Sequence, residues 1–459
     1  MEPPALRRDA SSYESLDKRY LWHPFTQHQF WNQCSPLIVD AAEGFELIDV
    51  DGSRYLDGVS SLWCNVHGHG HPALLEALRK QSEKLCHSTL LGLSHTAVLD
   101  LAEELTSVIP ANLTRLFFSD SGTSAVEAAL RIALEWWQKQ PDAASHKRKK
   151  LLSLDGAYHG DTIGAVGVGF LPAFHRNVSP VLVPALRTPP PHLFRFSDGL
   201  PEEAAVQASL DSLRALLQRE GDAIAAFFVE PLVQGAAGIW THPESFLREA
   251  ISLCRKHGVL VIADEVATGF GKTGDLFAVQ KAGIQPDILV MGKGLSGGYL
   301  PISAACTTEA LFNGFLGELS EGKTFYYGQT FAGNPLAAAV SAENLRLLRN
   351  DQTLQKLNER LPAFHRAIDE KIAPLPQVDE VRRNGVMVGI ELTQTPGEHD
   401  PFPADSRTSW KIVDAARRRG VVIRPLGNVI ILMPAVAMPE ADLLRLVDVT
   451  AEALIEGVS

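Results

Sequence analysis

The stretch ESFLREAISLCRKHGVLVIAD, residues 244–264, decides the fold class because it predicts a helix followed at once by a buried strand. Helical periodicity runs over Glu244–His257 and ends at Gly258, a residue type that commonly terminates helices. The apolar run from Val259 to Ala263 has the length of a strand buried on both faces. A helix that leads directly into such a strand is typical of a parallel sheet covered by helices.

The same alternation of helices and short apolar runs extends from about residue 72 to residue 350. Amphipathic helices are expected at 94–109 and 123–139. Further buried strands are expected at 115–119, 151–154, 224–229 and 288–291. The segment 184–201 contains three consecutive prolines and is expected to be a long surface excursion, without helix or central strand. We therefore predict an α/β fold with a mostly parallel central sheet.

The pattern changes after about residue 350, which predicts a second, smaller domain. A helix is expected at 353–372, strands at 386–392, 421–424 and 429–433, and a last helix from Pro439. This α+β domain is expected to be completed by the N-terminal residues. The predicted boundaries are 1–71 for the N-terminal segment of the small domain, 72–345 for the large domain and 346–459 for the C-terminal part.

Composition excludes several classes of protein. The 459 residues include 42 basic and 54 acidic side chains, a formal net charge of −12, which argues against binding to nucleic-acid phosphates. No apolar run has membrane-spanning length, and the N-terminus lacks the apolar core of a secretory signal. The odd number of scattered cysteines indicates a reducing compartment. We therefore expect a cytoplasmic protein with neither a membrane nor a nucleic acid as partner; its cysteines are Cys34, Cys64, Cys86, Cys254 and Cys306.

Two glycine-rich segments match the dinucleotide pattern GxGxxG, at 269–274 and 292–297. In that motif the first glycine directly follows a strand and the third opens a helix. The first segment begins too far beyond Asp264, and the second has Lys293 where a pyrophosphate must approach. A phosphate-binding loop around 271–273 is excluded because Val266 stands where that motif needs glycine. A nicotinamide-dependent oxidoreductase is therefore the second hypothesis, not the first.

The segment His67-Gly-His69-Gly-His71 is the basis of a third hypothesis, a metal-binding module. Imidazoles are common metal ligands. However, no cysteine or carboxylate lies at a matching short spacing, so a loop of hydrogen-bonded histidines is the favoured interpretation and no metal site is predicted.

Three features together carry the chemistry. Ser119–Thr123 lies between a strand and a helix, where free backbone N–H groups suit one phosphate, although a plain helix cap explains it equally well. Asp264 ends a buried strand, where its carboxylate needs a cationic or hydrogen-bond-donating partner such as a pyridinium. Lys293 follows the next apolar strand and can form a Schiff base in an apolar setting. The combination specifies pyridoxal phosphate as the cofactor.

Longer motifs extend this interpretation to a family. The sequences DEVATGFG at 264–271, GKGLSGG at 292–298 and GQTFAGNP at 328–335 resemble those of the class III (ω-amino) aminotransferases of pyridoxal phosphate fold type I. Within that family the chain is similar to the enzymes that make 7,8-diaminononanoate from 8-amino-7-oxononanoate in biotin biosynthesis. The segments LWHPFT at 21–26, DGVSSLW at 57–63, YHGDT at 158–162, EPLVQG at 230–235 and RPLG at 424–427 carry this closer resemblance.

The resemblance implies a cofactor site. Asp264 would pair with the ring nitrogen, Lys293 would form the Schiff base, and Tyr158 and Val266 would pack on opposite faces of the ring. Gly328 and Thr330 would reach the phosphate of a partner subunit, which implies a homodimer with shared active sites. The cofactor-binding residues implied are Gly122, Thr123, Tyr158, Glu230, Asp264, Val266, Lys293, Gly328 and Thr330.

The resemblance also implies the reaction. A donor amine and a keto acceptor are small-molecule partners in a ping-pong transamination, in which Lys293, Asp264 and Tyr158 are the catalytic residues. Arg424 would bind the carboxylate of the acceptor, a task that its planar guanidinium suits. The substrate-binding residues implied are Phe25, Trp63, Tyr158, Lys293 and Arg424. Another class III ω-aminotransferase, acting on a different amine or keto acid, is the alternative.

Two departures from the usual family pattern bear on the donor. That pattern has tyrosine at Phe25 and tryptophan at Leu62, and in the common branch these groups shape a pocket for S-adenosylmethionine. A branch that uses lysine as donor looks more similar at 25–27, 60–63 and 87–92. Loss of a hydroxyl and an indole fits a slimmer donor, although neutral repacking explains it too. We favour lysine over S-adenosylmethionine as the donor.

Overall fold

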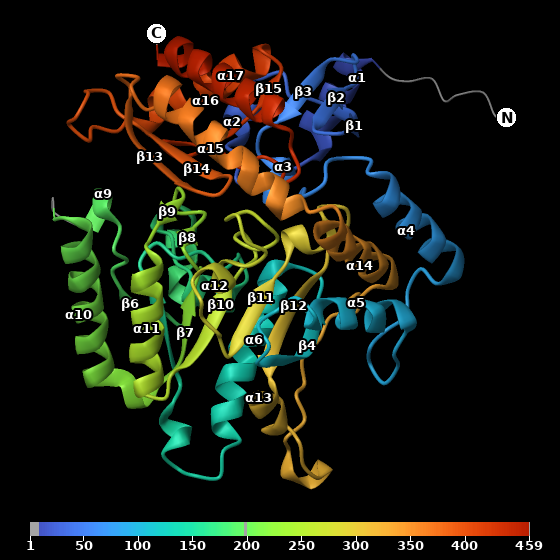
Figure 1. Ribbon diagram of the computed structural model, residues 1–459, viewed down its shortest axis with the longest axis vertical. Helices are drawn as coiled ribbons and strands as arrows, with labels where there is room; N and C mark the ends of the chain where they lie inside the picture. Colours follow the sequence, from blue (N-terminus) through green and yellow to red (C-terminus); the bar gives the residue numbers. More distant parts are fainter. Residues whose placement is uncertain (1–8, 197–199, 459) are drawn as a thin grey trace.

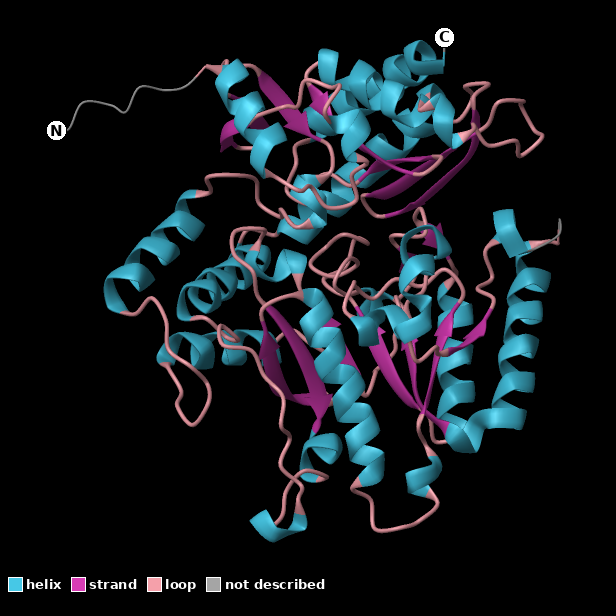
Figure 2. Ribbon diagram, turned by 180° about the vertical axis from the view of Figure 1, so that it is seen from behind, coloured by secondary structure: helices cyan, strands magenta, loops and turns pink. Residues whose placement is uncertain are grey.

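The computed structural model describes residues 9–196 and 200–458, and a seven-stranded sheet forms the centre of this part (Figures 1 and 2). The strand order is β4-β12-β11-β10-β7-β5-β6. All neighbouring pairs are parallel except those of β12, which runs antiparallel to both β11 and β4. The prediction of an α/β fold with a mostly parallel sheet is confirmed. The bounds are β4 Leu113–Ser119, β5 Lys150–Leu154, β6 Leu186–Thr188, β7 Ile224–Val229, β10 Leu260–Asp264, β11 Ile288–Met291 and β12 Ser303–Thr308.

The stretch that predicted the fold adopts the expected structure. Helix α11, Glu244–Lys256, is followed by Gly258 with φ +68°, in the left-handed region that glycine adopts readily. The chain then enters β10, which pairs in parallel with β7 on one side and with β11 on the other.

Both faces of the sheet are buried, which explains why its strands are apolar throughout. In β7, Phe228 packs in the cluster formed with helix α6, Gly122–Gln138, whereas Phe227 and Val229 pack in the cluster on the opposite face. Helix α10, Glu202–Glu220, packs beside α11 (Figure 1). Side chains alternate between the faces of a strand, so burial of both faces requires a continuous apolar run.

The expectation for residues 184–201 is wrong in part. Residues 186–188 form β6, which pairs in parallel with β5 at the edge of the sheet, and Leu193–Phe196 form the short helix α9, although no helix was expected. The prolines follow this strand directly, and Pro190 and Pro191 are buried. An edge position tolerates this arrangement because one side of the strand has no ladder partner to lose. Residues 197–199 of the predicted excursion lie outside the described residues.

Elements from the N-terminal and C-terminal parts of the described chain lie together in the upper part of the molecule as drawn in Figure 1. N-terminal strands β1 Val39–Glu43, β2 Glu46–Asp49 and β3 Arg54–Asp57 form a sheet with C-terminal β15 Val421–Val422, which pairs in parallel with β3. A second sheet contains β13 Val378–Asn384, β14 Met387–Leu392, β17 Val429–Leu432 and β16 Arg424–Leu426. Helices α15 Thr353–Lys371, α16 Thr408–Arg418 and α17 Glu440–Val458 pack nearby. The exact domain boundaries stay a prediction.

The remaining elements connect these layers. No helix within residues 9–196 and 200–458 is long and apolar enough to cross a membrane. The other elements are α1 Ala10–Tyr20, α2 His28–Trp31, α3 Ser60–Trp63, α4 Pro72–Lys84, α5 Thr96–Thr106, α7 Ile163–Val168, α8 Pro172–His175, α9 Leu193–Phe196, α12 Ala278–Lys281, α13 Glu309–Asn313, α14 Pro335–Asn350, a hairpin of β8 Val233–Gln234 and β9 Trp240–Thr241, and 3₁₀ turns at Ser145–Lys147, Arg176–Val181, Gly221–Ala223, Lys293–Ser296, Leu319–Glu321 and Ala404–Ser406.

Candidate active site

A cavity of about 230 Å³ lies at the carboxyl ends of five strands of the central sheet. The segments after β4, β5, β7, β10 and β11 each contribute to it, because those strands run in one direction and end at one edge. The structure therefore brings together eight of the predicted site residues. The lining residues are Trp63, Gly122, Thr123, Tyr158, His159, Gly160, Asp161, Glu230, Ala236, Asp264, Val266, Ala267 and Lys293.

The carboxylate of Asp264 is buried at the end of β10. Its Oδ1 accepts a hydrogen bond from Val266 N at 3.0 Å, and its Oδ2 lies 2.7 Å from His159 Nδ1. His159 is also buried, and its Nε2 has no hydrogen-bond partner among the described residues. Sequence reasoning missed His159, although it directly follows the predicted Tyr158. These contacts fix the orientation of the Asp264 carboxylate in the cavity wall.

Lys293 lies after β11 and shares the cavity with Asp264. Its Nζ is 4.7 Å from the ring centroid of Trp63, which is within the range of a cation–π contact. Burial lowers the pKa of the Lys293 amine, while the Asp264 carboxylate acts in the opposite direction. Within the described part of the chain, Lys293 forms no ion pair. A lysine that loses its proton easily is suited to act as a nucleophile and as a base.

The indole of Trp63 reaches Lys293 from a strained turn. Four consecutive non-glycine residues, Ser60–Trp63, have φ between 44° and 72°, in the left-handed region. Each such residue costs about 1–2 kcal/mol. Two hydroxyl groups stabilise the turn by hydrogen bonds. Ser60 Oγ donates to Met433 O at 2.7 Å, and Ser61 Oγ donates to Asp57 Oδ2 at 2.7 Å. The cavity wall therefore depends on contacts to the C-terminal part of the chain.

Lys272 supports the same turn from the large sheet. Its side chain is almost fully buried, and Nζ donates to Ser60 Oγ, Asn65 O and Pro434 O at 2.7, 3.3 and 3.1 Å. Burial lowers the pKa of Lys272 to about 7. Nothing in the local sequence pattern indicated these partners of Lys272, which lie more than 160 positions away. Lys272 is a structural connector between sheet and turn.

The first turn of helix α6 forms the opposite wall. A Cβ on Gly122 would lie 2.6 Å from Val266 Cγ1, so only glycine fits there. Ser121 caps the helix by accepting from Ser124 N, and Thr123 Oγ1 lies 3.0 Å from Thr162 Oγ1. The first N–H groups of a helix have no partner within the helix, and they favour an anion. The structure shows the plain cap at Ser121; the anion site stays a prediction.

Glu230 and Tyr158 are joined across the cavity floor. The carboxylate of Glu230 accepts from Tyr158 N at 3.0 Å and from Gly235 N at 2.9 Å. The pKa of Glu230 is raised to about 7, mainly by burial and also by the nearby Asp264, whereas His159 and the two backbone N–H groups act in the opposite direction. The phenol of Tyr158 donates to Asp161 Oδ2 at 2.6 Å, and burial raises the pKa of Tyr158 well above its usual range.

A second cavity, of about 320 Å³, contains Arg424 and Phe25. Burial lowers the pKa of Arg424, and this guanidinium forms no hydrogen bond or ion pair with any residue that the structure describes. Phe25 packs edge-on against Phe174, with ring centroids 5.3 Å apart. Arg424 is therefore a cation available to a ligand in a largely apolar pocket.

Gly328 and Thr330 line neither cavity, and both are exposed. The space around Gly328 is open, since a Cβ there would meet nothing within 4 Å. The structure thus leaves these two predicted residues on the surface of a single chain.

The glycine-rich and histidine-rich segments have structural surroundings of their own. Residues 269–274 form turns, and Gly294 packs against Phe270. His69 Nε2 lies 3.2 Å from Asp57 Oδ2, and the rings of His67 and His71 are 5.6 Å apart. Within residues 9–196 and 200–458 there is no group of three or more histidine, cysteine, aspartate or glutamate side chains that could hold a metal ion.

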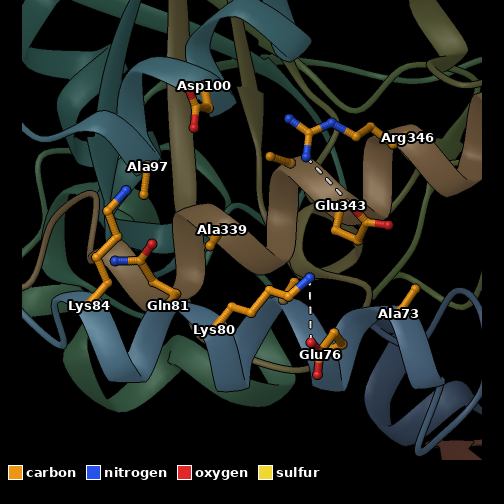
Figure 3. A pocket seen from close by; sticks show the side chains of 12 residues that line it. Ala73, Glu76, Lys80, Gln81, Lys84, Ala97, Asp100, Ala339, Glu343 and Arg346 are labelled. Carbon is orange, nitrogen blue, oxygen red and sulfur yellow. Dashed lines mark hydrogen bonds and ion pairs between the residues drawn. The ribbon is translucent and has the colours of Figure 1, made fainter.

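A larger hollow, of about 470 Å³, lies between α4, α5 and α14, away from Lys293 (Figure 3). Several of its charged side chains are paired with one another, as in the contacts of Lys80 with Glu76 and of Arg346 with Glu343. None of its lining residues in the described chain is a predicted site residue. We therefore place the chemistry in the cavity of Lys293.

The cavity fits pyridoxal phosphate. Among the described residues, the buried carboxylate of Asp264 contacts the imidazole of His159 and forms no ion pair with a lysine or arginine. Lys293, which forms no ion pair within this part of the chain either, lies in the same cavity, and Gly122 opens a helix N-terminus toward it. These groups match a ring nitrogen, an aldehyde and a phosphate respectively.

Comparisons with known proteins agree with this site. A family model described as aminotransferase class-III matches residues 29–454. Adenosylmethionine-8-amino-7-oxononanoate aminotransferase from Nitratidesulfovibrio vulgaris is 44% identical over 453 residues, which cover 99% of this chain and 83% of that protein. The crystal structure of the protein of that name from Methanocaldococcus jannaschii has a TM-score of 0.91 at 34% identity, covering 98% of this chain and 99% of that one.

A third relative has been solved with a cofactor form bound. The omega transaminase from Pseudomonas jessenii in complex with PMP has a TM-score of 0.90 at 28% identity, covering 97% of this chain and 98% of that one. The resemblance drawn from the motifs is confirmed, and the cofactor is pyridoxal phosphate. The chain belongs to the class III aminotransferases, an enzyme family that transfers amino groups.

Proposed function

We propose that this enzyme transfers an amino group to 8-amino-7-oxononanoate and so forms 7,8-diaminononanoate, a step of biotin biosynthesis. Relatives that match nearly the whole chain at 35–44% identity carry the name of that activity. The observation that carries the proposal is Arg424, a cation without an acidic partner in the described chain, in a pocket beside Phe25 and Phe174. An acceptor with a carboxylate at the end of an apolar chain matches such a pocket.

The cavity residues divide the work of transamination. Bound pyridoxal phosphate supplies an aldehyde that bonds to amines and a ring that accepts electrons. Asp264 would keep the ring nitrogen protonated, and Gly122 and Thr123 would hold the phosphate. Lys293 Nζ takes the proton from the amine-bearing carbon of the donor and, in the second half-reaction, returns a proton to the acceptor carbon. The two half-reactions follow one another in ping-pong order.

Arg424→Ala is expected to raise the KM for the acceptor about 10- to 100-fold, with a much smaller change in kcat. A hydrogen bond to a charged group contributes about 1.5–3 kcal/mol, which corresponds to that range. Steady-state kinetics with 8-amino-7-oxononanoate measure it. Arg418→Ala, which removes an exposed arginine paired with Glu456, is the matched control. An unchanged acceptor KM in Arg424→Ala would contradict the proposal.

For the amino donor we propose lysine. Phe25 and Leu62 replace the tyrosine and tryptophan of the usual family pattern, and the side chains of both are more than half exposed. They therefore leave room and offer no hydroxyl or indole N–H to a large donor. S-Adenosylmethionine is the competing donor, because the names of the relatives include it.

A single-turnover experiment separates the two donors. Lysine is expected to convert the bound cofactor to its amine form, seen as loss of the visible absorption band, whereas S-adenosylmethionine leaves the band in place. The double variant Phe25→Tyr, Leu62→Trp is expected to gain reactivity toward S-adenosylmethionine by about tenfold, the effect of 1.4 kcal/mol. Conversion by S-adenosylmethionine and not by lysine would refute the choice of lysine.

Another ω-aminotransferase activity is the second candidate, because an omega transaminase is nearly as similar in structure. The two functions differ in the acceptor. If the cofactor in its amine form reacts faster with simple keto acids than with 8-amino-7-oxononanoate, the second candidate is correct. The Arg424 pocket favours the first.

We further propose a homodimer with shared active sites. Gly328 and Thr330 lie on the surface beside the exposed side chain of Phe331, and Leu99 and Phe312 are further exposed apolar side chains. Leu99 and Phe312 line an apolar hollow of about 550 Å³. Large exposed apolar patches commonly mark interfaces between proteins.

Light scattering is expected to give twice the mass of the chain, and Thr330→Ala is expected to weaken binding of pyridoxal phosphate several-fold, as loss of one hydrogen bond to a phosphate does. A monomer that binds the cofactor as tightly as the assembled protein does would exclude shared sites.

All five cysteines are free thiols, which supports the proposal that the enzyme works in the cytoplasm.

A further inference from the structure

His175, at the end of helix α8, lies behind Asp161 and has no role in the site described above. It is buried, with 4% of its surface exposed. Its Nε2 lies 3.2 Å from Asp161 Oδ1, and its Nδ1 lies 3.0 Å from Leu171 N. The other oxygen of Asp161 accepts the phenol hydrogen of Tyr158 at 2.6 Å. The three side chains therefore form one continuous chain of hydrogen bonds that ends in the cofactor cavity.

The backbone determines the direction of every hydrogen bond in this chain. An amide N–H can only donate, so the Nδ1 of His175 must carry a lone pair toward Leu171. A histidine with a bare Nδ1 carries its hydrogen on Nε2, and Nε2–H donates to Asp161. The carboxylate accepts on both oxygens, so the hydroxyl of Tyr158 points its hydrogen at Asp161. The phenol oxygen is left with lone pairs that can accept a hydrogen bond in the cavity.

Ring packing holds His175 in this position. Its ring lies nearly parallel to that of Tyr158, at an interplanar angle of 14° and a centroid distance of 6.1 Å. The rings of Phe170 and Phe174 pack around it. Phe174 also lines the second cavity, where it contacts Phe25. His175 thus lies where the wall of the cofactor cavity meets the wall of the Arg424 pocket.

Asp161 needs such support because it is the exposed member of the chain, with 48% of its side chain accessible. A free carboxylate at that exposure samples several rotamers and exchanges its partners with water. A second, buried donor restricts it to one orientation. We propose that His175 is a positioning residue that locks Asp161, and through it the phenol of Tyr158, with the oxygen of that phenol presented to the cofactor cavity as a hydrogen-bond acceptor.

Two substitutions distinguish the role of His175 Nδ1 as an acceptor from the role of Nε2 as a donor. Asparagine can place an oxygen near the position of Nδ1, and so keeps an acceptor for Leu171 N but removes the donor to Asp161. Glutamine can place its amide N–H₂ near Nε2, and so keeps that donor but loses the acceptor. We expect His175→Asn to weaken binding of pyridoxal phosphate to the apoenzyme about fivefold and to raise the acceptor KM about tenfold, with an apoenzyme Tm similar to that of His175→Gln, because both variants lose the packed ring. His175→Gln is expected to restore both values to within about twofold of the wild type.

A double-mutant cycle tests whether His175 acts through the phenol. In the Tyr158→Phe background, which lacks that hydroxyl, His175→Asn is expected to change the acceptor KM less than twofold. Effects that multiply in the double variant would overturn the proposal, as would equal losses in His175→Asn and His175→Gln. Either result would indicate that His175 contributes only by packing against its neighbours and not through its hydrogen bond to Asp161.

Nitrogen NMR of the wild-type enzyme, labelled at histidine, provides a test without any variant. The proposal requires His175 to be neutral with its hydrogen on Nε2, and a hydrogen on Nδ1 would overturn it. The inference rests on the cofactor site of the proposed function but not on the identity of the acceptor. The cofactor titration and the NMR measurement need no substrate, so failure of the proposed acceptor leaves them able to decide.

Discussion

Lys293→Ala will lower kcat by at least about 10⁴-fold, the largest effect expected of any single substitution in this chain. The variant loses both the amine that bonds to the cofactor and the group that moves the substrate proton, and acid–base catalysis alone contributes about 10²- to 10⁴-fold. Borohydride treatment of the wild type is expected to fix the cofactor on the peptide that contains Lys293, which mass spectrometry detects.

The control for this prediction is Lys323→Ala, which removes a surface lysine paired with Glu321. It should retain full activity and the covalently fixed cofactor. Fixation of the cofactor on another peptide of the Lys293→Ala protein, with turnover preserved, would show that Lys293 is not the amine used.

Asp264→Asn is expected to lower kcat about 10²- to 10³-fold, the usual effect of removing one preorganised electrostatic group from a reaction centre. Asparagine nearly keeps the shape of aspartate and can still accept from Val266 N, but it carries no charge to hold a proton on the ring nitrogen. Rapid-mixing measurement of each half-reaction will show where the rate is lost.

Glu265→Gln provides a matched control, because Glu265 is the neighbouring buried carboxylate and its partners lie outside the cavity. It accepts from Thr268 Oγ1 and from the backbone N–H groups of Ala278 and Val279. We expect lower thermal stability and little change in kcat. A cofactor analogue with a permanently charged ring nitrogen should restore much of the rate of Asp264→Asn; a failure to do so would indicate that Asp264 serves another purpose.

Much of the fold was predictable from the sequence because the central strands are buried on both faces. Such strands require unbroken apolar runs, and those at 224–229 and 288–291 were located to the residue. Strand β12 was missed because its sequence, SAACTT, is made of small and polar residues. This strand forms because β4 and β11 pair with it on both sides. That pairing is visible only in the folded structure.

The same distinction holds for the site. Asp264 and Lys293 were predictable because the carboxyl ends of parallel strands meet at one edge of a sheet. His159, His175 and Lys272 were not, since their roles come from partners that no local pattern indicates. Arg424 and Phe25 were assigned through resemblance alone, and the structure adds that they share a pocket.

The left-handed turn at Ser60–Trp63 has a consequence for the order in which the protein is made. The carbonyl of Met433, which accepts a hydrogen bond from Ser60, lies 373 positions further along the chain and leaves the ribosome long after the turn has been made. A growing chain can therefore contain Asp264, Lys293 and the whole central sheet while the indole of Trp63 still lacks its support. Cofactor capture by a nascent chain released before residue 433 should be loose and open to solvent. Synthesis of the segment that contains Met433 then closes the cavity wall, so that catalytic competence is expected only after this segment has emerged.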